Sequence, residues 1–218
     1  MIFVISLAAA KITMVEEKEK KLIQSARDVF MKYGIKSVNM DDMARHLSMS
    51  KKTLYQYVCD KDELVRKAVL GHGELEDAEI RQVCGKGLNA IDELLEIMHW
   101  VVDMLQNVHP SIVFDLQKYH PEVFGEMLEN RHRSIYDCMY LNMKKGQREG
   151  LYRKDFNVEA IAKVYIGRID MIFDQKLFPA KDWSLSQVYL EMFKYHIRGI
   201  ASEKGLEYLG QKLKSIKL

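Results

Sequence analysis

Residues Asn39–Val58, NMDDMARHLSMSKKTLYQYV, decide the fold of the N-terminal part of the chain. Two short runs of helix-compatible sequence follow each other here, introduced by Asn39 and Ser50. Both side chains can accept hydrogen bonds from the free backbone amides of a first helical turn. The pattern predicts two helices, Met40–Leu47 and Lys51–Tyr57, joined by a three-residue turn, which is the layout of a helix-turn-helix.

The second predicted helix carries a polar face. Its members are Lys51, Lys52, Thr53, Gln56 and Tyr57. Such side chains can bond phosphates and base edges when a helix enters the major groove of DNA. The first 70 residues also hold 13 Lys and Arg against 9 Asp and Glu, a mild positive excess. The alternative is that the tyrosines belong to the core and the lysines form a solvated face.

The neighbours of this motif fit one family pattern from Leu22 to Val65. The matching positions are Ala26, Phe30, Gly34, Asp42, Met43, Ala44, Ser50, Thr53, Leu54, Tyr55, Tyr57, Lys61 and Leu64. On these residues the sequence resembles the tetracycline-repressor (TetR) family. It departs at Ser48, where the family usually has glycine, and at Val58, where it usually has phenylalanine. A left-handed Ser48 costs about 1 kcal/mol, and the loss of the aromatic ring at Val58 thins the small core.

The resemblance implies a sequence-specific DNA-binding transcriptional regulator, by default a repressor, that a small-molecule effector releases. The residues it places at DNA are Asn39, Ser50, Lys51, Lys52, Thr53, Tyr55, Gln56, Tyr57 and Lys61, with Asn39 and Lys61 on the backbone. A homodimer would present two recognition helices about 34–36 Å apart on a palindromic double-stranded operator. The alternative is a helical interaction protein that retains the fold without DNA binding.

The rest of the sequence has helical periodicity and no useful β alternation. Further helices are predicted at 16–33, 61–83, 88–108, between His109-Pro110 and His120-Pro121, from there to about 149, and at 158–178, 185–205 and 206–218, with Gly34 and Gly150 as helix ends. The fold class is therefore all-α. A three-helix DNA-binding domain, 16–62, precedes a larger helical ligand-binding and dimerisation domain, 63–218, and residues 1–15 are either a tail or a misassigned translation start.

The resemblance also implies an effector pocket in the larger domain. Candidate lining residues are Trp100, Met104, Phe114, Tyr119, Phe124, Tyr136, Met139 and Tyr140, which at helical spacing are also typical of a core. Relatives dimerise through helices that correspond here to 158–178 and 185–205. The apolar residues of these helices are Ile161, Val164, Ile169, Ile172, Val188, Leu190, Phe193 and Ile197, and they could instead fill the protomer's own core.

Other functional classes find little support in the sequence. There is no GxSxG, P-loop or HExxH motif and no GxGxxG after a strand, so we expect no enzyme, no catalytic residue and no cofactor. The three dispersed cysteines, Cys59, Cys84 and Cys138, are typical of a reducing compartment, and we expect surface or packing roles for them in a cytoplasmic protein. No metal site is expected from His109, His120 and His132. No apolar run reaches the roughly 20 residues of a membrane span.

Overall fold

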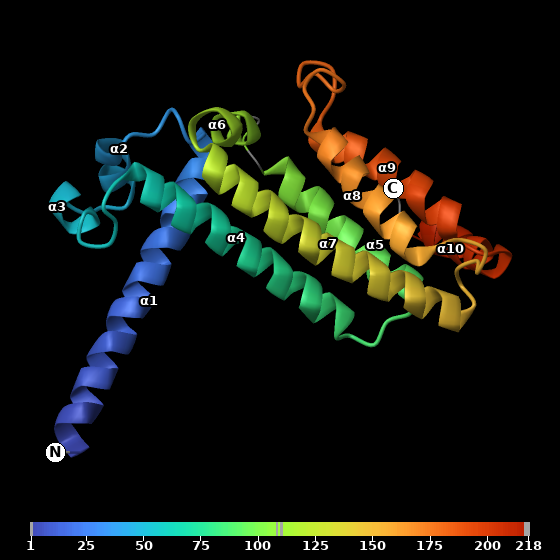
Figure 1. Cartoon of the computed structure of the whole chain (residues 1–218), viewed down its shortest axis with the longest axis horizontal. Helices are drawn as coiled ribbons and strands as arrows, with labels where there is room; N and C mark the ends of the chain where they lie inside the picture. Colours follow the sequence, from blue (N-terminus) through green and yellow to red (C-terminus); the bar gives the residue numbers. More distant parts are fainter. Residues whose placement is uncertain (1, 108, 110, 216–218) are drawn as a thin grey trace. The chain divides into compact units, whose positions relative to one another are not determined.

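The computed structural model describes the backbone of residues 2–107, 109 and 111–215, and the side chains of 17–212 apart from 108 and 110. Within these residues the chain is helical and forms no strand. The helices, drawn in Figure 1, are α1 (Ile2–Tyr33), α2 (Met40–His46), α3 (Lys51–Leu54), α4 (Lys61–Cys84), α5 (Ala90–Gln106), α6 (Ile112–Tyr119), α7 (Pro121–Glu149), α8 (Val158–Ile172), α9 (Leu185–Ile200) and α10 (Glu203–Ser215). The all-α prediction is confirmed.

The predicted helix caps are present. The Asn39 side chain accepts from the backbone amides of Asp41 and Asp42, both at 2.9 Å. Asp42 in return accepts from the Asn39 amide at 3.2 Å, which completes a capping box. The Ser50 hydroxyl accepts from the Thr53 amide at 3.0 Å and starts α3. These local bonds fix where both helices of the motif begin.

Several helix ends differ from the prediction. Gly34 and Gly150 end α1 and α7 with φ of 83° and 72°, as expected of left-handed caps. However, α3 ends at Leu54, and residues 55–57 continue as turns; α8 ends at Ile172, not at Phe178. At the N-terminus α1 begins at Ile2, whereas the first helix was predicted to begin at residue 16.

The chain divides into two compact units. Unit 1 consists of Met1–Leu75 and Val108–Met127, and unit 2 of Glu76–Asn107 and Leu128–Leu218. Helices α4 and α7 each begin in unit 1 and end in unit 2. Unit 1 is therefore wider than the predicted domain 16–62, because α6 and the first turns of α7 belong to it.

The core of unit 1 is built from the residues that carry the family pattern. Ala26, Leu54 and Leu64 are fully buried, and α6 adds Ile112 and Leu116. Val58 is also buried, at 3% exposure, in the position where the family usually has a larger phenylalanine. This small core orients α2 and α3.

The core of unit 2 lies between α5, α7, α8 and α9, with α10 packed beside them. This core contains most of the residues considered for a dimer interface. Its buried members are Ile169, Ile172, Val188, Phe193 and Ile197, and Ile161 and Leu190 pack against the same cluster. The interpretation that they fill the protomer's own core is therefore confirmed for these seven. Val164, by contrast, is 48% exposed.

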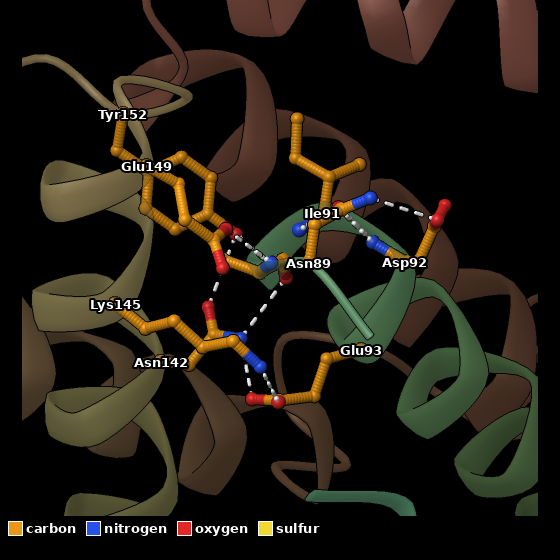
Figure 2. A network of polar contacts seen from close by, with 9 residues as sticks. Asn89, Ile91, Asp92, Glu93, Asn142, Lys145, Glu149 and Tyr152 are labelled. Atoms are coloured by element: carbon orange, nitrogen blue, oxygen red, sulfur yellow. Dashed lines mark hydrogen bonds and ion pairs between the residues drawn. The ribbon is translucent and has the colours of Figure 1, made fainter. Parts of the chain in front are cut away.

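A buried polar network joins α5 to the C-terminal half of α7 (Figure 2). Glu93, only 4% exposed, accepts from the Asn142 amide at 2.8 Å and from the Lys145 ammonium at 2.7 Å. Asn142 also donates to the carbonyl of Ala90 at 2.9 Å, and the Tyr152 hydroxyl lies 3.1 Å from that carbonyl. The charge of Glu93 is thus compensated inside unit 2.

Within the described residues, no helix combines the length and the apolar character needed to cross a membrane.

Candidate nucleic-acid interface

The turn between α2 and α3 has the strained conformation that the sequence suggested. Ser48 has φ of +54°, a left-handed value that side chains other than glycine adopt at a cost. The turn brings Met43 and Ala44 of α2 against the same core as Leu54 of α3. One side of α3 therefore packs in this core, and its other side chains remain at the surface.

An exposed polar group follows from this arrangement. Lys51, Lys52, Tyr55 and Gln56 are all exposed, Tyr55 at 43%. Lys51 forms an ion pair with Asp41 at 3.0 Å, and this bond raises the pKa of Lys51, which therefore stays cationic. Lys52 makes no ion pair with any described residue. These four side chains offer two cations, a phenol and an amide on one short segment.

The other residues of this region that were predicted to contact DNA also make contacts within the protein. The hydroxyls of Ser50 and Thr53 lie 2.8 Å apart, and Ser50 also caps α3. Thr53 and Tyr57 are half-buried, and Tyr57 packs against the core of unit 1. Asn39 serves as the cap of α2 and remains exposed.

Lys61 has a structural role that the sequence did not suggest. Its ammonium donates to the carbonyl of Ile35 at 2.7 Å, and burial lowers the pKa of Lys61. The side chain therefore anchors the first turn of α4 to the connection between α1 and α2. Because its ammonium is bonded within unit 1, Lys61 is poorly placed to act as a free phosphate-binding cation.

Asp115 of α6 supplies a second anchor on the same connection. It is 4% exposed and accepts from the backbone amides of Ile35 at 3.1 Å and Lys36 at 2.9 Å. The Ser111 hydroxyl donates to the same carboxylate oxygen at 3.2 Å. About 80 residues separate Asp115 from Ile35, so no local sequence pattern could have indicated this bond.

Sequence reasoning also missed two exposed cations of unit 1. Arg45 of α2 has a side chain 77% exposed, paired with Asp42 one turn away. Lys36 is exposed, and its ammonium lies 4.9 Å from the ring centre of Tyr119. The i, i+3 spacing of Asp42 and Arg45 was a sequence signal for an exposed helix face.

The predicted pocket residues are divided between the units. Phe114, Tyr119 and Phe124 belong to unit 1, where Phe114 is 53% and Tyr119 38% exposed. The other five lie in unit 2; Met139 is buried there, Tyr136 stacks on Tyr140 at 5.8 Å, and Trp100 and Met104 are partly buried.

Unit 2 contains a small cavity elsewhere. Its volume is about 10 Å³, and Leu95, Met98, Phe193 and Ile197 contribute to its wall. Space of this size admits about one water molecule. None of the eight predicted pocket residues lines it.

The three histidines that we considered as metal ligands have different partners. His109 contacts Ser111 at 3.0 Å, His120 contacts Asp62 at 3.1 Å, and His132 contacts Asp170 at 2.9 Å. Across the described side chains, no three His, Cys, Asp or Glu residues are grouped so that they could hold a metal ion.

Comparisons with known proteins agree with this geometry. Residues 22–68 match the family model described as bacterial regulatory proteins, tetR family. The HTH-type transcriptional regulator UidR of Escherichia coli K12 is 21% identical over 159 residues, which cover 71% of this chain and 79% of UidR.

Two solved structures show the same fold. A transcriptional regulator from Cytophaga hutchinsonii has a TM-score of 0.69 at 16% identity, over 85% of this chain and 99% of that one. Thermus thermophilus FadR, a TetR-family transcriptional repressor solved with lauroyl-CoA, has a TM-score of 0.55 at 13% identity, over 85% and 96% of the chains.

The capped pair α2 and α3, with its exposed polar face, thus defines a DNA-binding protein of the helix-turn-helix class. Within that class, residues 22–68 match the tetR family of bacterial regulatory proteins, and these relatives and solved structures support a TetR-family regulator.

Proposed function

We propose that the chain represses transcription as a homodimer on a palindromic operator, and that a small-molecule effector bound in unit 2 releases it. The observation that carries the proposal is the exposed group Lys51, Lys52, Tyr55 and Gln56 on a capped helix-turn-helix. A protein that occupies an operator blocks a promoter without further contacts, so repression needs nothing beyond this surface.

The exposed side chains suggest a division of roles. Lys52 and Gln56 point outward without internal ion pairs among the described residues and suit base-edge contacts in the major groove. Tyr55, Lys51 and Asn39 suit contacts to the phosphate backbone, which set register and carry little sequence information. Ser50, Thr53, Tyr57 and Lys61 hold the segment in shape and act on DNA through it.

An exposed apolar face on α8 and α9 supports the dimer. Val164 and Met171 are 48% and 49% exposed and lie two turns apart on one side of α8. On α9, Tyr195 is 69% exposed, and the Arg168 guanidinium lies 4.9 Å from its ring centre. Exposed apolar residues rimmed by a cation are typical of protein interfaces. We assign this face to the second copy of the chain.

The interior of unit 2 supports an effector with a hydrogen-bonding group. Burial lowers the pKa of His196 to about 4, so its ring is neutral, and its Nε2 has no hydrogen-bond partner among the described residues. The ring packs edge-on against Tyr165, 4.6 Å away. A buried polar atom without a partner is costly unless something satisfies it. The cavity of unit 2 holds only about 10 Å³ and is not lined by His196, so effector binding must open unit 2. The solved FadR complex shows that a protein of similar fold accepts lauroyl-CoA.

Asp115 provides the means of release within unit 1. It ties α6 to the amides of Ile35 and Lys36, directly before α2. A shift of α6 would break these bonds and disturb the helix-turn-helix. A loss of operator affinity of roughly 100-fold corresponds to about 2.7 kcal/mol, which is within the usual range of allosteric coupling.

Fluorescence anisotropy with DNA from beside the gene tests this function. We expect steep salt dependence between about 50 and 200 mM and a preference for one palindromic sequence. Tyr55→Ala should weaken binding to all sequences, whereas Gln56→Ala should change the preference by about 1–3 kcal/mol at its base pair. Lys52→Ala should also lower the salt slope by about 1 if it touches phosphate as well as bases.

Lys181→Ala is the matched control, because this exposed lysine lies in unit 2, in the connection between α8 and α9. Its affinity should equal that of the unaltered protein. Binding without sequence preference and without salt dependence would refute the proposal and favour the helical interaction protein that retains the fold without DNA binding.

A further inference from the structure

Two of the three cysteines lie together in unit 2. Cys84 is the last residue of α4 and is exposed, and Cys138 lies within α7 and is half-buried. The side chains of Cys84 and Cys138 interact, and the interaction shifts the pKa of both thiols. The sequence suggested only surface or packing roles for each cysteine on its own.

A second contact shows that the two helices face each other here. The Ser134 hydroxyl of α7 bonds to the carboxylate of Asp77 of α4. Ser134 lies one turn before Cys138, and Asp77 lies two turns before Cys84, so each pair occupies one side of its helix. The thiols therefore meet on the facing sides of α4 and α7.

The two thiols have different chemical character. The side-chain interaction with Cys138 lowers the pKa of Cys84, and the Lys145 ammonium acts in the same direction. The same interaction, together with burial, raises the pKa of Cys138 well above its ordinary value. An exposed thiol with a lowered pKa beside a half-buried thiol with a raised pKa is the arrangement of a nucleophile and its resolving partner.

We propose that Cys84 and Cys138 form a reversible disulfide when the protein meets a peroxide, and that this modification lowers operator affinity. The second part rests on the proposed function. The Cys84 thiolate attacks one peroxide oxygen, the O–O bond breaks, and the leaving oxygen takes a proton to give water from hydrogen peroxide.

The resulting sulfenic acid then reacts with Cys138. The Cys138 sulfur attacks the sulfur of Cys84, the S–S bond forms, and the S–O bond breaks as hydroxide takes the thiol proton to give a second water. The two thiols lose two electrons in total, and the peroxide gains them. Thiols such as dithiothreitol reverse the change by exchange.

Bond formation would move α4 more than α7. Sulfurs in non-bonded contact lie about 1.5–2 Å farther apart than the roughly 2.05 Å of a disulfide. Cys138 is followed on α7 by the buried Met139, whereas Cys84 ends α4 and is followed by the exposed Gly85 and by Gly87 at φ of +70°. The last turn of α4 is therefore the part that can move when the disulfide forms.

Such a movement would act on the DNA-binding unit through α4 itself. The first turns of this helix supply Leu64 and Val65, both fully buried, to the core of unit 1. Lys61 anchors the same end to Ile35. We therefore expect the disulfide to weaken operator binding about tenfold, which is within the usual range of coupling between sites.

The test uses the full chain with Cys59→Ser, which leaves only the proposed pair. Cys59 is a suitable position to remove because it is exposed in unit 1 and its contact with Glu63 raises its pKa. After hydrogen peroxide, non-reducing digestion and mass spectrometry should find a peptide in which Cys84 and Cys138 are joined within one chain. Operator affinity by anisotropy should fall about tenfold and return with dithiothreitol.

Two further variants, both in the Cys59→Ser background, separate the steps. With Cys138→Ser, dimedone should trap sulfenic acid on Cys84, no disulfide should form, and operator affinity should stay constant. With Cys84→Ser, neither product should form. Circular dichroism checks that both variants fold, and Cys138→Ala replaces Cys138→Ser if that variant does not.

A missing disulfide, or one that joins two chains, would overturn the proposal. A disulfide that changes operator affinity by less than about twofold would overturn the regulatory part of the proposal. If the reduced protein binds no operator, the proposed function fails instead, while the mass-spectrometric result still decides the chemistry of the pair.

Discussion

The helix-turn-helix of unit 1 and the buried network of unit 2 both depend on polar side chains, but these act over different distances along the chain. In unit 1, Asn39 and Asp42 cap α2, and Ser50 caps α3 through Thr53, all within three residues. In unit 2, Glu93 meets Lys145 across about 52 residues. Short-range bonds specify the shape of the helix-turn-helix, whereas long-range bonds specify how the helices of unit 2 pack.

The contrast has a physical consequence for the two units. Loss of a helix cap removes one hydrogen bond at a solvated site, at a cost of about 1 kcal/mol. Loss of one member of a buried charged pair leaves the other charge without compensation, which costs several times more. Substitutions in the network of unit 2 should therefore have the largest effects on stability.

The largest effect is expected for Lys145→Met. The substitution keeps the length of the side chain but leaves the carboxylate of Glu93, 4% exposed, with the Asn142 amide as its one remaining partner among the described residues. Lys145 itself retains 24% exposure, so water reduces the penalty, and we expect a loss of about 2–3 kcal/mol in the free energy of unfolding. Urea denaturation followed by circular dichroism at fixed protein concentration measures it.

Lys144→Met is the matched control, because Lys144 is the adjacent residue and is exposed. It should change the free energy of unfolding by less than about 0.5 kcal/mol. Equal losses from the two substitutions would show that the charge of Lys145 has no special role and would remove the contrast between the units.

The same contrast explains which parts of the structure the sequence could predict. The caps Asn39 and Ser50, the left-handed Ser48 and the ends at Gly34 and Gly150 all depend on a residue and its close neighbours, and they are confirmed. The end of α8 at Ile172 was not predicted, because the apolar pattern continues beyond it and only packing decides where the helix stops.

The site was predictable to a similar extent. The surface positions of Lys51, Lys52 and Gln56 follow from the helical pattern, and that of Tyr55 follows from the family resemblance; their roles at DNA stay predictions. The anchoring role of Lys61, and with it Asp115, could not be foreseen, because the partners belong to distant segments. The pocket residues were chosen by size and spacing, and such features do not tell which of two cores a side chain joins.

The second prediction concerns the close approach of α7 to Tyr152, three residues after its end. A Cβ at Gly146 would lie 2.0 Å from the ring of Tyr152, whose hydroxyl is fixed by Ala90 and Asn142. Because the ring cannot move without breaking the network, Gly146→Ala should reduce the free energy of unfolding by about 2 kcal/mol.

Gly125→Ala tests the same helix in unit 1. Nothing lies within 4 Å of a Cβ placed there, so alanine should gain helix propensity and stabilise by up to about 1 kcal/mol. Thermal unfolding of both variants gives the comparison. A stabilised Gly146→Ala protein would mean that Tyr152 is free to shift and that the network is less rigid than its bonds suggest.

The smallest effect is expected in the turn of unit 1. Ser48 has φ of +54°, a conformation that glycine adopts without the steric penalty of a side chain. Ser48→Gly should therefore raise the free energy of unfolding by about 1 kcal/mol, less the larger entropy of glycine in the unfolded chain. Ser48→Ala retains the Cβ and should give no gain. If both variants were equally stable in urea, the strain at this turn would not limit the stability of the helix-turn-helix, and the smaller Val58 would be the next position to change.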